Sequence, residues 1–429
     1  MFYKNLYKLG QNYRNPSLKI SLNFLKESDN WSLKELEDYQ LKKIKELVAF
    51  SFENSKYYNT KLKELGISPK DIQSLSDIKK LPIITKQELI TKNKEIHTGF
   101  KFKKTFKAVT SGSTGTSLEF FREETADSFN RASIYRGYSW YNVNPWDKNG
   151  YFWGFNFSFF KKIKTKFLDG LQNRFRAFSY NESEFNSFVK KAQKARYIHG
   201  YSSMIYQAAK IINEKGLTKP KRLKMIKGTS EKIFENYHEE VKEAFGLKII
   251  SEYGAAETGI IAFECPKGNM HINMEGVYVE EVDNEIIVTN LQMKSFPIIR
   301  YKLGDYIELA KREKKCTCGR EHLILEEITG RVGSNVYGRQ QIYPSFIFYY
   351  IFKNLMNIHG ITLNYQIIQL KKGMLKFKIE QNLSNGESLK LKKEIHKYFK
   401  EDMEIEIIQK AILHSFKGKL KSFISEIDE

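Results

Sequence analysis

Cysteine, proline and long apolar runs are scarce in this chain. Only 3 cysteines and 8 prolines occur among 429 residues, and an odd number of cysteines argues against a framework of disulfide bonds. No apolar stretch approaches the roughly 20 residues that a membrane-spanning helix needs. The segment at 1–15 also lacks the apolar core of a signal peptide. We therefore expect a cytoplasmic protein without a transmembrane segment.

Acidic residues are outnumbered, with 50 Asp and Glu against 71 Lys and Arg, which gives a formal net charge of +21. The basic residues are scattered in short lysine-rich runs at 161–166, 221–227, 311–315 and 389–393. Such scatter favours a solvated surface over a nucleic-acid interface, so we expect no nucleic-acid partner. Attraction of small anionic ligands, or loose association with an anionic membrane surface, stays open.

The chain is longer than one hydrophobic core usually supports, and 41% of its residues are hydrophobic. Leu41, Ile44, Leu47 and Val48 recur at the spacing of an amphipathic helix. Helical and strand-like patterns then alternate, which predicts an α/β fold. We expect helices at 184–195, 203–215 and 231–245, and strands at 223–226, 247–251, 277–282 and 285–289, the last two joined by a turn at Asp283-Asn284.

After Gly330 the pattern changes to that of a compact α+β module. Strands are expected at 362–370, 374–380 and 403–408, with a helix at 386–399. About a hundred residues is a typical size for a small domain. The sequence therefore predicts a large N-terminal domain at 1–330 and a small C-terminal domain at 331–429.

A phosphate-binding loop is suggested by Thr110 to Gly115, which read TSGSTG. Glycine permits close backbone approach, so consecutive N–H groups and hydroxyls can converge on phosphate oxygens. The segment is not the G-x-x-x-x-G-K-[ST] loop, because Thr116 stands where lysine would follow. Taken alone, such a cluster is equally typical of a surface turn.

TSGSTG is followed in order by YGAAETG at 253–259, YKLGDY at 301–306, GRVG at 330–333 and a Gly418-Lys419 pair. This series resembles the core motifs of adenylate-forming enzymes, above all the phenylacetate-CoA ligase family and its capsular-polysaccharide branch. The stretches at 54–58, 81–86, 200–203 and 229–231 agree with it, so the resemblance covers nearly the whole chain. It implies a large multi-layer adenylation domain, a small mobile lid, and an ATP-dependent ligase that forms an acyl-adenylate.

The resemblance assigns roles to individual residues. Glu257 would hold Mg²⁺, Tyr253 with Gly254 would contact the adenine, and Asp305 would bind the ribose hydroxyls. Arg331 would approach the ribose or phosphates, and Lys419 would neutralise charge developing at the α-phosphate. The β and γ phosphates of ATP would be held by Ser111, Gly112, Ser113, Thr114 and Gly115.

Each assignment has a structural alternative. Glu257 also suits a surface glutamate, Tyr253 a core tyrosine and Asp305 a turn. Many relatives carry lysine and proline after the loop, but this chain has Thr116 and Ser117, which leaves Arg122 as a possible substitute for the lysine charge. The positions of the family's acidic hinge are occupied by Gly333 and Ser334. These departures motivate an alternative function, a non-catalytic nucleotide-binding assembly protein.

The acyl group and its acceptor are less well defined by the motifs. The aromatic segment at 151–157 and the turn at 200–203 suit either an acyl pocket or the core. The partner expected is a small carboxylic acid, with CoA as acceptor in most of the superfamily and an amine as the alternative in the capsule-related branch. A homodimer is left open.

The three cysteines suggest a metal site. Cys265 with His271 forms C-x5-H, and Cys316 with Cys318 forms C-x-C-G. Together they supply three sulfurs and one nitrogen, a donor set suited to tetrahedral zinc with no open position, hence a structural ion. Ordinary reduced thiols are the alternative. A catalytic cysteine is a third option that no local pattern supports.

Overall fold

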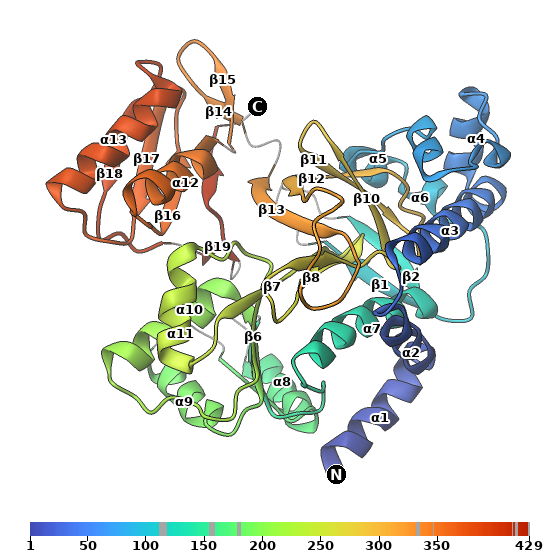
Figure 1. The fold of residues 1–429 in the computed structure, drawn as a ribbon, viewed down its shortest axis with the longest axis horizontal. Coiled ribbons are helices and arrows are strands. Elements are labelled where there is room, and N and C mark those ends of the chain that lie inside the picture. Colours follow the sequence, from blue (N-terminus) through green and yellow to red (C-terminus); the bar gives the residue numbers. More distant parts are fainter. Residues whose placement is uncertain are drawn as a thin grey trace. The chain divides into compact units, whose positions relative to one another are not determined.

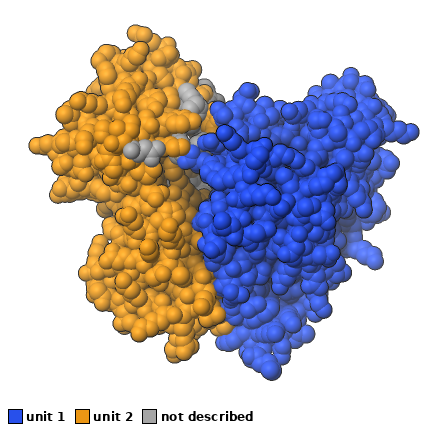
Figure 2. Space-filling model, viewed as in Figure 1, with its two compact units in different colours: residues 1–147, 251–303, 307–328 blue, residues 148–250, 304–306, 329–429 orange. Residues whose placement is uncertain are grey.

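The computed structural model describes residues 1–110, 118–153, 159–177, 182–331, 335–345, 347–413, 415–416 and 419–427. These residues form two compact units, coloured separately in Figure 2: unit 1 comprises 1–147, 251–303 and 307–328, and unit 2 comprises 148–250, 304–306 and 329–429. Both units combine helices with strands, and the two alternate in the first part of unit 2, so the predicted α/β class is confirmed (Figure 1). The division into domains at 1–330 and 331–429 follows a different boundary and stays a prediction.

Helices make up much of the N-terminal part of unit 1. Helix α3 begins with a capping box, in which the Ser32 hydroxyl accepts from the Glu35 N–H and the Glu35 carboxylate accepts from the Ser32 N–H. Ile44, Leu47 and Val48 lie on its buried face, which confirms the predicted amphipathic helix. The bounds are α1 (Phe2–Arg14), α2 (Leu18–Ser28), α3 (Leu33–Asn54), α4 (Lys56–Glu64), η1 (Pro69–Asp71), η2 (Leu75–Lys80), α5 (Lys86–Thr91), α6 (Asn93–Ile96) and α7 (Glu124–Trp140).

Strands complete unit 1. β1 (Thr105–Val109) and β2 (Glu119–Glu123) form an antiparallel pair. The larger sheet has the order β10-β11-β12-β13-β9-β8-β7. Its β10–β11 turn places Asp283 and Asn284 at φ values of 53° and 62°, as a two-residue hairpin requires, so this predicted hairpin is confirmed. The bounds are β7 (Ile249–Ala255), β8 (Gly259–Glu264), β9 (Met270–Ile272), β10 (Val277–Val282), β11 (Glu285–Asn290), β12 (Tyr301–Leu309) and β13 (Ile324–Arg331).

Unit 2 begins with parallel strands in the order β6-β5-β3-β4. Phe152, Ile198 and Ile226 are buried in its apolar core, as expected for the strands of a parallel sheet, which is normally covered by other elements. The helix expected from 231 begins at Glu235, after Phe234. The bounds are β3 (Asn149–Phe152), α8 (Phe159–Leu171), β4 (Arg174–Arg176), α9 (Glu182–Ala192), β5 (Tyr197–Tyr201), α10 (Ser202–Glu214), β6 (Met225–Thr229) and α11 (Glu235–Phe245).

The last part of unit 2 is the α+β module expected from the sequence. A four-stranded sheet has the order β18-β17-β16-β21, and α13 begins with a capping box of Ser384 and Glu387. The bounds are β14 (Asn335–Tyr337), β15 (Ile342–Pro344), α12 (Ile347–His359), β16 (Tyr365–Gln369), β17 (Met374–Ile379), α13 (Asn385–Phe399), β18 (Glu404–Ile408), β19 (Ser415–Phe416), β20 (Lys419–Leu420) and β21 (Phe423–Ser425). Among the described residues, none of these helices, nor any of unit 1, has the length and hydropathy needed to cross a membrane.

Candidate functional site

Glu257 lies in the turn between β7 and β8, and only 6% of its surface is exposed to solvent. The Oη of Tyr301, a buried residue at the start of β12, donates a hydrogen bond of 3.1 Å to Glu257 Oε1. An ionised carboxylate is costly to bury without partners, so this hydrogen bond and nearby cations matter. Glu257 is therefore a held, buried carboxylate and not a surface glutamate.

Arg122 supports the same turn from β2. Its Nη2 donates to the carbonyl oxygen of Ala256, and its Nη1 lies 3.6 Å from Asp127 Oδ1. Burial lowers the pKa of Arg122, while the carboxylates of Asp127 and Glu257, among others, oppose that shift. The guanidinium therefore stays charged beside the Glu257 turn.

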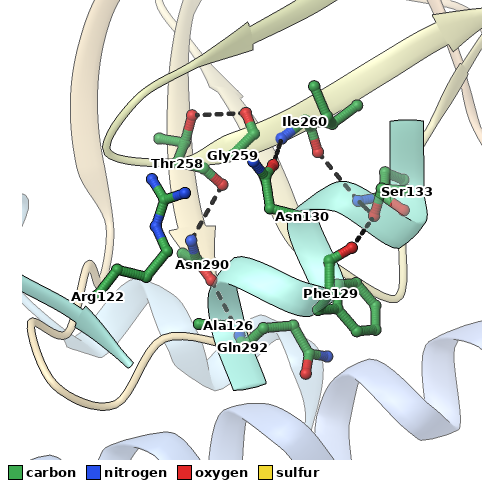
Figure 3. Close-up of a pocket in the computed structure, with 12 residues that line it drawn as sticks. Arg122, Ala126, Phe129, Asn130, Ser133, Thr258, Gly259, Ile260, Asn290 and Gln292 are labelled. Atoms are coloured by element: carbon green, nitrogen blue, oxygen red, sulfur yellow. Dashed lines mark hydrogen bonds between the residues drawn. The ribbon is translucent and has the colours of Figure 1, made fainter. Parts of the chain in front are cut away.

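Two asparagines hold the backbone that follows Glu257 (Figure 3). Asn290 Nδ2 donates to the Thr258 carbonyl oxygen over 3.1 Å, and Asn130 Oδ1 accepts from the Ile260 N–H over 3.0 Å. These bonds link the turn to β11 and α7, so together with Arg122 on β2 and Tyr301 on β12 the position of Glu257 depends on four elements besides its own hairpin.

Tyr253 and Gly254 stand on the β7 side of this hairpin, where the register shifts. A Cβ on Gly254 would lie 2.4 Å from the carbonyl oxygen of Gly259, so a larger residue would push the strands apart. Tyr253 is partly buried against the apolar core of unit 1. The structure thus brings Tyr253, Gly254 and Glu257 together on one hairpin, while the adenine contact stays a prediction.

The other predicted nucleotide residues belong to other elements of the chain. Asp305 is buried on β12, after Gly304 at a φ of 83°. Arg331 ends β13, and Lys419 begins β20. Ser111, Gly112, Ser113, Thr114 and Gly115 lie outside the described residues.

The described residues on either side of 111–117 are Thr110 and Leu118. The Thr110 N–H donates to the Leu118 carbonyl oxygen, and the Leu118 N–H donates to Thr110 Oγ1, each over 2.9 Å. Thr110 and Leu118 therefore continue the pairing of β1 with β2 by one further residue on each side.

The four predicted zinc ligands converge in unit 1. Their ligand atoms all lie within 4.8 Å of one another. The Sγ atoms of Cys265 and Cys316 are 3.6 Å apart, close to the roughly 3.8 Å between two sulfurs of a tetrahedron with Zn–S bonds of about 2.3 Å. Cys318 Sγ lies 3.2 Å from His271 Nε2. This group could hold a metal ion.

The surroundings of the cluster also suit a metal. His271 Nδ1 lies 3.2 Å from the His322 carbonyl oxygen, which orients Nε2 toward the sulfurs, as the second contact of a ligating histidine usually does. Burial lowers the pKa of His271 to about 4, which keeps the imidazole neutral as a ligand must be. Burial also raises the pKa of the Cys265 thiol to about 12, which disfavours a free catalytic thiolate.

A buried ionic network that the sequence analysis did not anticipate lies next to this cluster. Arg136 Nη1 is 2.7 Å from Glu275 Oε1, and His322 Nε2 is 2.9 Å from the same oxygen. Burial alone would raise the pKa of Glu275, but the Arg136 guanidinium and the hydrogen bonds from His322 and Ser28 hold it well below its usual range. No local pattern could reveal the pair, since 139 positions separate Arg136 from Glu275. Tyr301, also missed as a partner of Glu257, does at least begin the YKLGDY motif.

Comparison with known proteins bears on the fold. No family model matches the chain. It is 24% identical to Protein CapK of Staphylococcus aureus over 329 residues, which cover 72% of this chain and 70% of that protein. Among solved structures, 2-hydroxyisobutyryl-CoA ligase in the postadenylation state with R3-HIB-AMP gives a TM-score of 0.71 at 15% identity, covering 94% of this chain and 92% of that one.

The same ligase in an open conformation with 2-HIB-AMP and CoA gives a TM-score of 0.63 at 14% identity, covering 92% of this chain and 93% of that one. Identity this low carries information on fold and not on substrate. The chain therefore has the mixed α/β fold of an acyl-CoA ligase, with a large sheet and a smaller C-terminal sheet.

Proposed function

We propose that this protein is an ATP-dependent carboxylate ligase that works through an acyl-adenylate. The fold shared with 2-hydroxyisobutyryl-CoA ligase supports the proposal. The observation that carries the proposal is the buried carboxylate of Glu257 in the YGAAETG motif, which accepts a hydrogen bond from Tyr301. Stability alone gives no reason to bury a charge in a turn, because a charged group that leaves water must regain its lost solvation.

The first half-reaction joins the acid to AMP. A carboxylate oxygen of the substrate attacks the α-phosphorus of ATP, the bond to the bridging oxygen breaks, and pyrophosphate leaves with the negative charge. Because the reactants are anions, the protein must neutralise phosphate charge and fix the line of attack. Mg²⁺ held by Glu257 would supply much of that neutralisation, since it prefers carboxylate and phosphate oxygens.

The remaining roles follow the motifs. The backbone of Ser111 to Gly115 would bind the β and γ phosphates, and the Lys419 amine would stabilise charge at the α-phosphate. Asp305 would accept hydrogen bonds from the ribose hydroxyls. Arg122 and Tyr301 would position Glu257 without touching the nucleotide.

The second half-reaction passes the acyl group to an acceptor. With CoA, the thiolate attacks the acyl carbon, a thioester forms and AMP leaves. With an amine, as in the alternative route to surface polysaccharides, the neutral nitrogen attacks the acyl carbon and loses a proton to solvent, an amide forms and AMP leaves. The similarity to Protein CapK keeps the amine route as the second candidate, because the motifs resemble the capsule-related branch.

The test measures pyrophosphate release with a panel of carboxylic acids, alone, with CoA and with amines. We expect Glu257→Gln to lower adenylation about a hundredfold or more, because it removes a charge that the transition state uses. Glu308→Gln, at an exposed position of β12, is the matched control and should be unaffected. Acceleration by amines alone would refute the CoA route, and unchanged release in the Glu257 variant would refute the site.

The non-catalytic alternative predicts that Lys419 has no catalytic role. If the protein only binds nucleotide, no carboxylate supports ATP–pyrophosphate exchange. Exchange that is present in the wild type and abolished by Lys419→Ala would reject this alternative.

A further inference from the structure

Helix α8 packs against the rest of unit 2 with its polar side and exposes its apolar side to solvent. Phe160 is 83% exposed and Phe167 67%, and Ile163, Leu168 and Leu171 are also exposed. The buried side carries Asp169, whose Oδ2 and Oδ1 lie 2.8 and 2.9 Å from Nε and Nη2 of Arg176 on β4. An ordinary surface helix of a globular protein is oriented the other way.

The exposed apolar residues form one stripe. Phe160, Ile163, Phe167 and Leu171 follow each other at steps of three and four residues, which places them within one face of an α-helix. A contiguous apolar patch of this kind marks an interaction surface, because isolated apolar side chains are common on proteins but continuous stripes are not.

The charges around the stripe indicate what covers it. Lys164 and Lys166 are exposed in the same helix, and Lys162 is partly exposed. The helix has a single acidic residue, Asp169, and that residue is buried. A helix that combines exposed phenylalanines with lysines and no exposed acid has the composition of one that lies in the surface of an anionic bilayer.

Helix α1 in unit 1 carries the same combination independently. Phe2, Leu9 and Tyr13 are exposed at positions that share one helical face, with spacings of seven and four residues. The helix contains Lys4, Lys8 and Arg14, no acidic residue and no fully buried residue. Both helices are labelled in Figure 1.

From these observations we infer that α8 is a docking helix for an anionic phospholipid surface, with Phe160 and Phe167 inserted among the acyl chains and Lys164 and Lys166 at the headgroups. Docking by a second copy of the chain is disfavoured, because it would bring two sets of lysines together. The inference does not depend on the ligase activity.

Co-sedimentation with vesicles tests it, using the full chain with phosphatidylcholine alone or mixed with phosphatidylglycerol. We expect binding to the mixed vesicles and little binding to phosphatidylcholine. Phe160→Ser/Phe167→Ser should weaken binding about tenfold or more, because it removes two apolar side chains that would be buried among the acyl chains. Lys164→Gln/Lys166→Gln should weaken it about thirtyfold.

The controls change equivalent residues elsewhere. Ile358→Ser alters an exposed apolar residue of α12, and Lys392→Gln/Lys393→Gln alters exposed lysines of α13. Each should bind vesicles like the wild type, and every variant should keep the wild-type melting temperature because the changed residues are exposed.

Several results would overturn the inference. Equal binding to both vesicle types would remove the role of charge, and equal losses in the α8 and α13 lysine variants would reduce it to diffuse attraction. Wild-type binding by Phe160→Ser/Phe167→Ser, or a loss found only with Phe2→Ser/Leu9→Ser, would exclude α8. A dimer in sedimentation velocity that the Phe160 and Phe167 changes dissociate, without vesicle binding, would assign the face to a second copy.

Discussion

Replacing Arg136 with methionine should lower the free energy of unfolding of unit 1 by about 3–5 kcal/mol, the usual cost of leaving a buried charge unpaired. Glu275 is 0% exposed, and Arg136 Nη1 lies 2.7 Å from its Oε1. Arg136 Nη2 also donates to Asn273 Oδ1 over 2.7 Å. Methionine fills much of the arginine volume, so the loss is chiefly electrostatic.

Amide hydrogen exchange measures this loss locally. Exchange in peptides from α7 that is limited by unfolding of unit 1 should accelerate about a hundredfold to several thousandfold, because each 1.4 kcal/mol is a factor of ten. Peptides from α10 of unit 2 serve as the internal control. Lys314→Met, which removes an exposed pair 2.5 Å long with Glu326, should change exchange by less than about fivefold.

The pH dependence of the same variant has a definite sign. The pKa of Glu275 is lowered in the folded protein, so its stabilising contribution is present above the unfolded value of 4.5 and is lost as pH falls through the folded value. The difference in melting temperature between wild type and Arg136→Met should therefore be larger at pH 7 than at pH 4.

A second substitution separates charge from packing. Arg136→Met/Glu275→Leu removes both charges and should recover much of the lost stability, since a buried pair is often replaceable by apolar residues. A single variant as stable as the wild type would refute the reasoning, and so would a double variant weaker than the single one.

Three further changes follow from the site. Tyr301→Phe removes the 3.1 Å hydrogen bond to Glu257 and should lower ATP–pyrophosphate exchange about tenfold, with a higher Mg²⁺ requirement; an unchanged Mg²⁺ titration would count against the role of Glu257. Cys318→Ser should lower the zinc content measured by elemental mass spectrometry and, by several degrees, the melting temperature, whereas equal zinc content would exclude a metal site. Gly254→Ala places a Cβ 2.4 Å from the Gly259 carbonyl oxygen and should cost about 1–3 kcal/mol in urea denaturation, and a wild-type midpoint would contradict that geometry.

The sequence by itself determined the fold class, most of the tested local elements and the group of four residues that could hold a metal ion. Periodicity predicted α3 and the β10–β11 hairpin, because helix and turn signals are local. Cys265, His271, Cys316 and Cys318 were identified from residue type and short spacing, since few side chains offer zinc a soft donor. The motif series likewise singled out Glu257 before its burial was known.

Only the tertiary structure decided what surrounds these residues. The hydrogen bond from Tyr301 to Glu257 joins residues 44 positions apart, and the contact of Arg122 with Ala256 spans 134. The orientation of α8 was equally hidden, because a helical pattern defines two faces without saying which one packs. The hydrogen bond from Arg176 on the following strand to Asp169 fixes the polar face of α8 as the face that packs. Pairings between distant positions depend on how the chain folds back on itself, and no local pattern of residues encodes them.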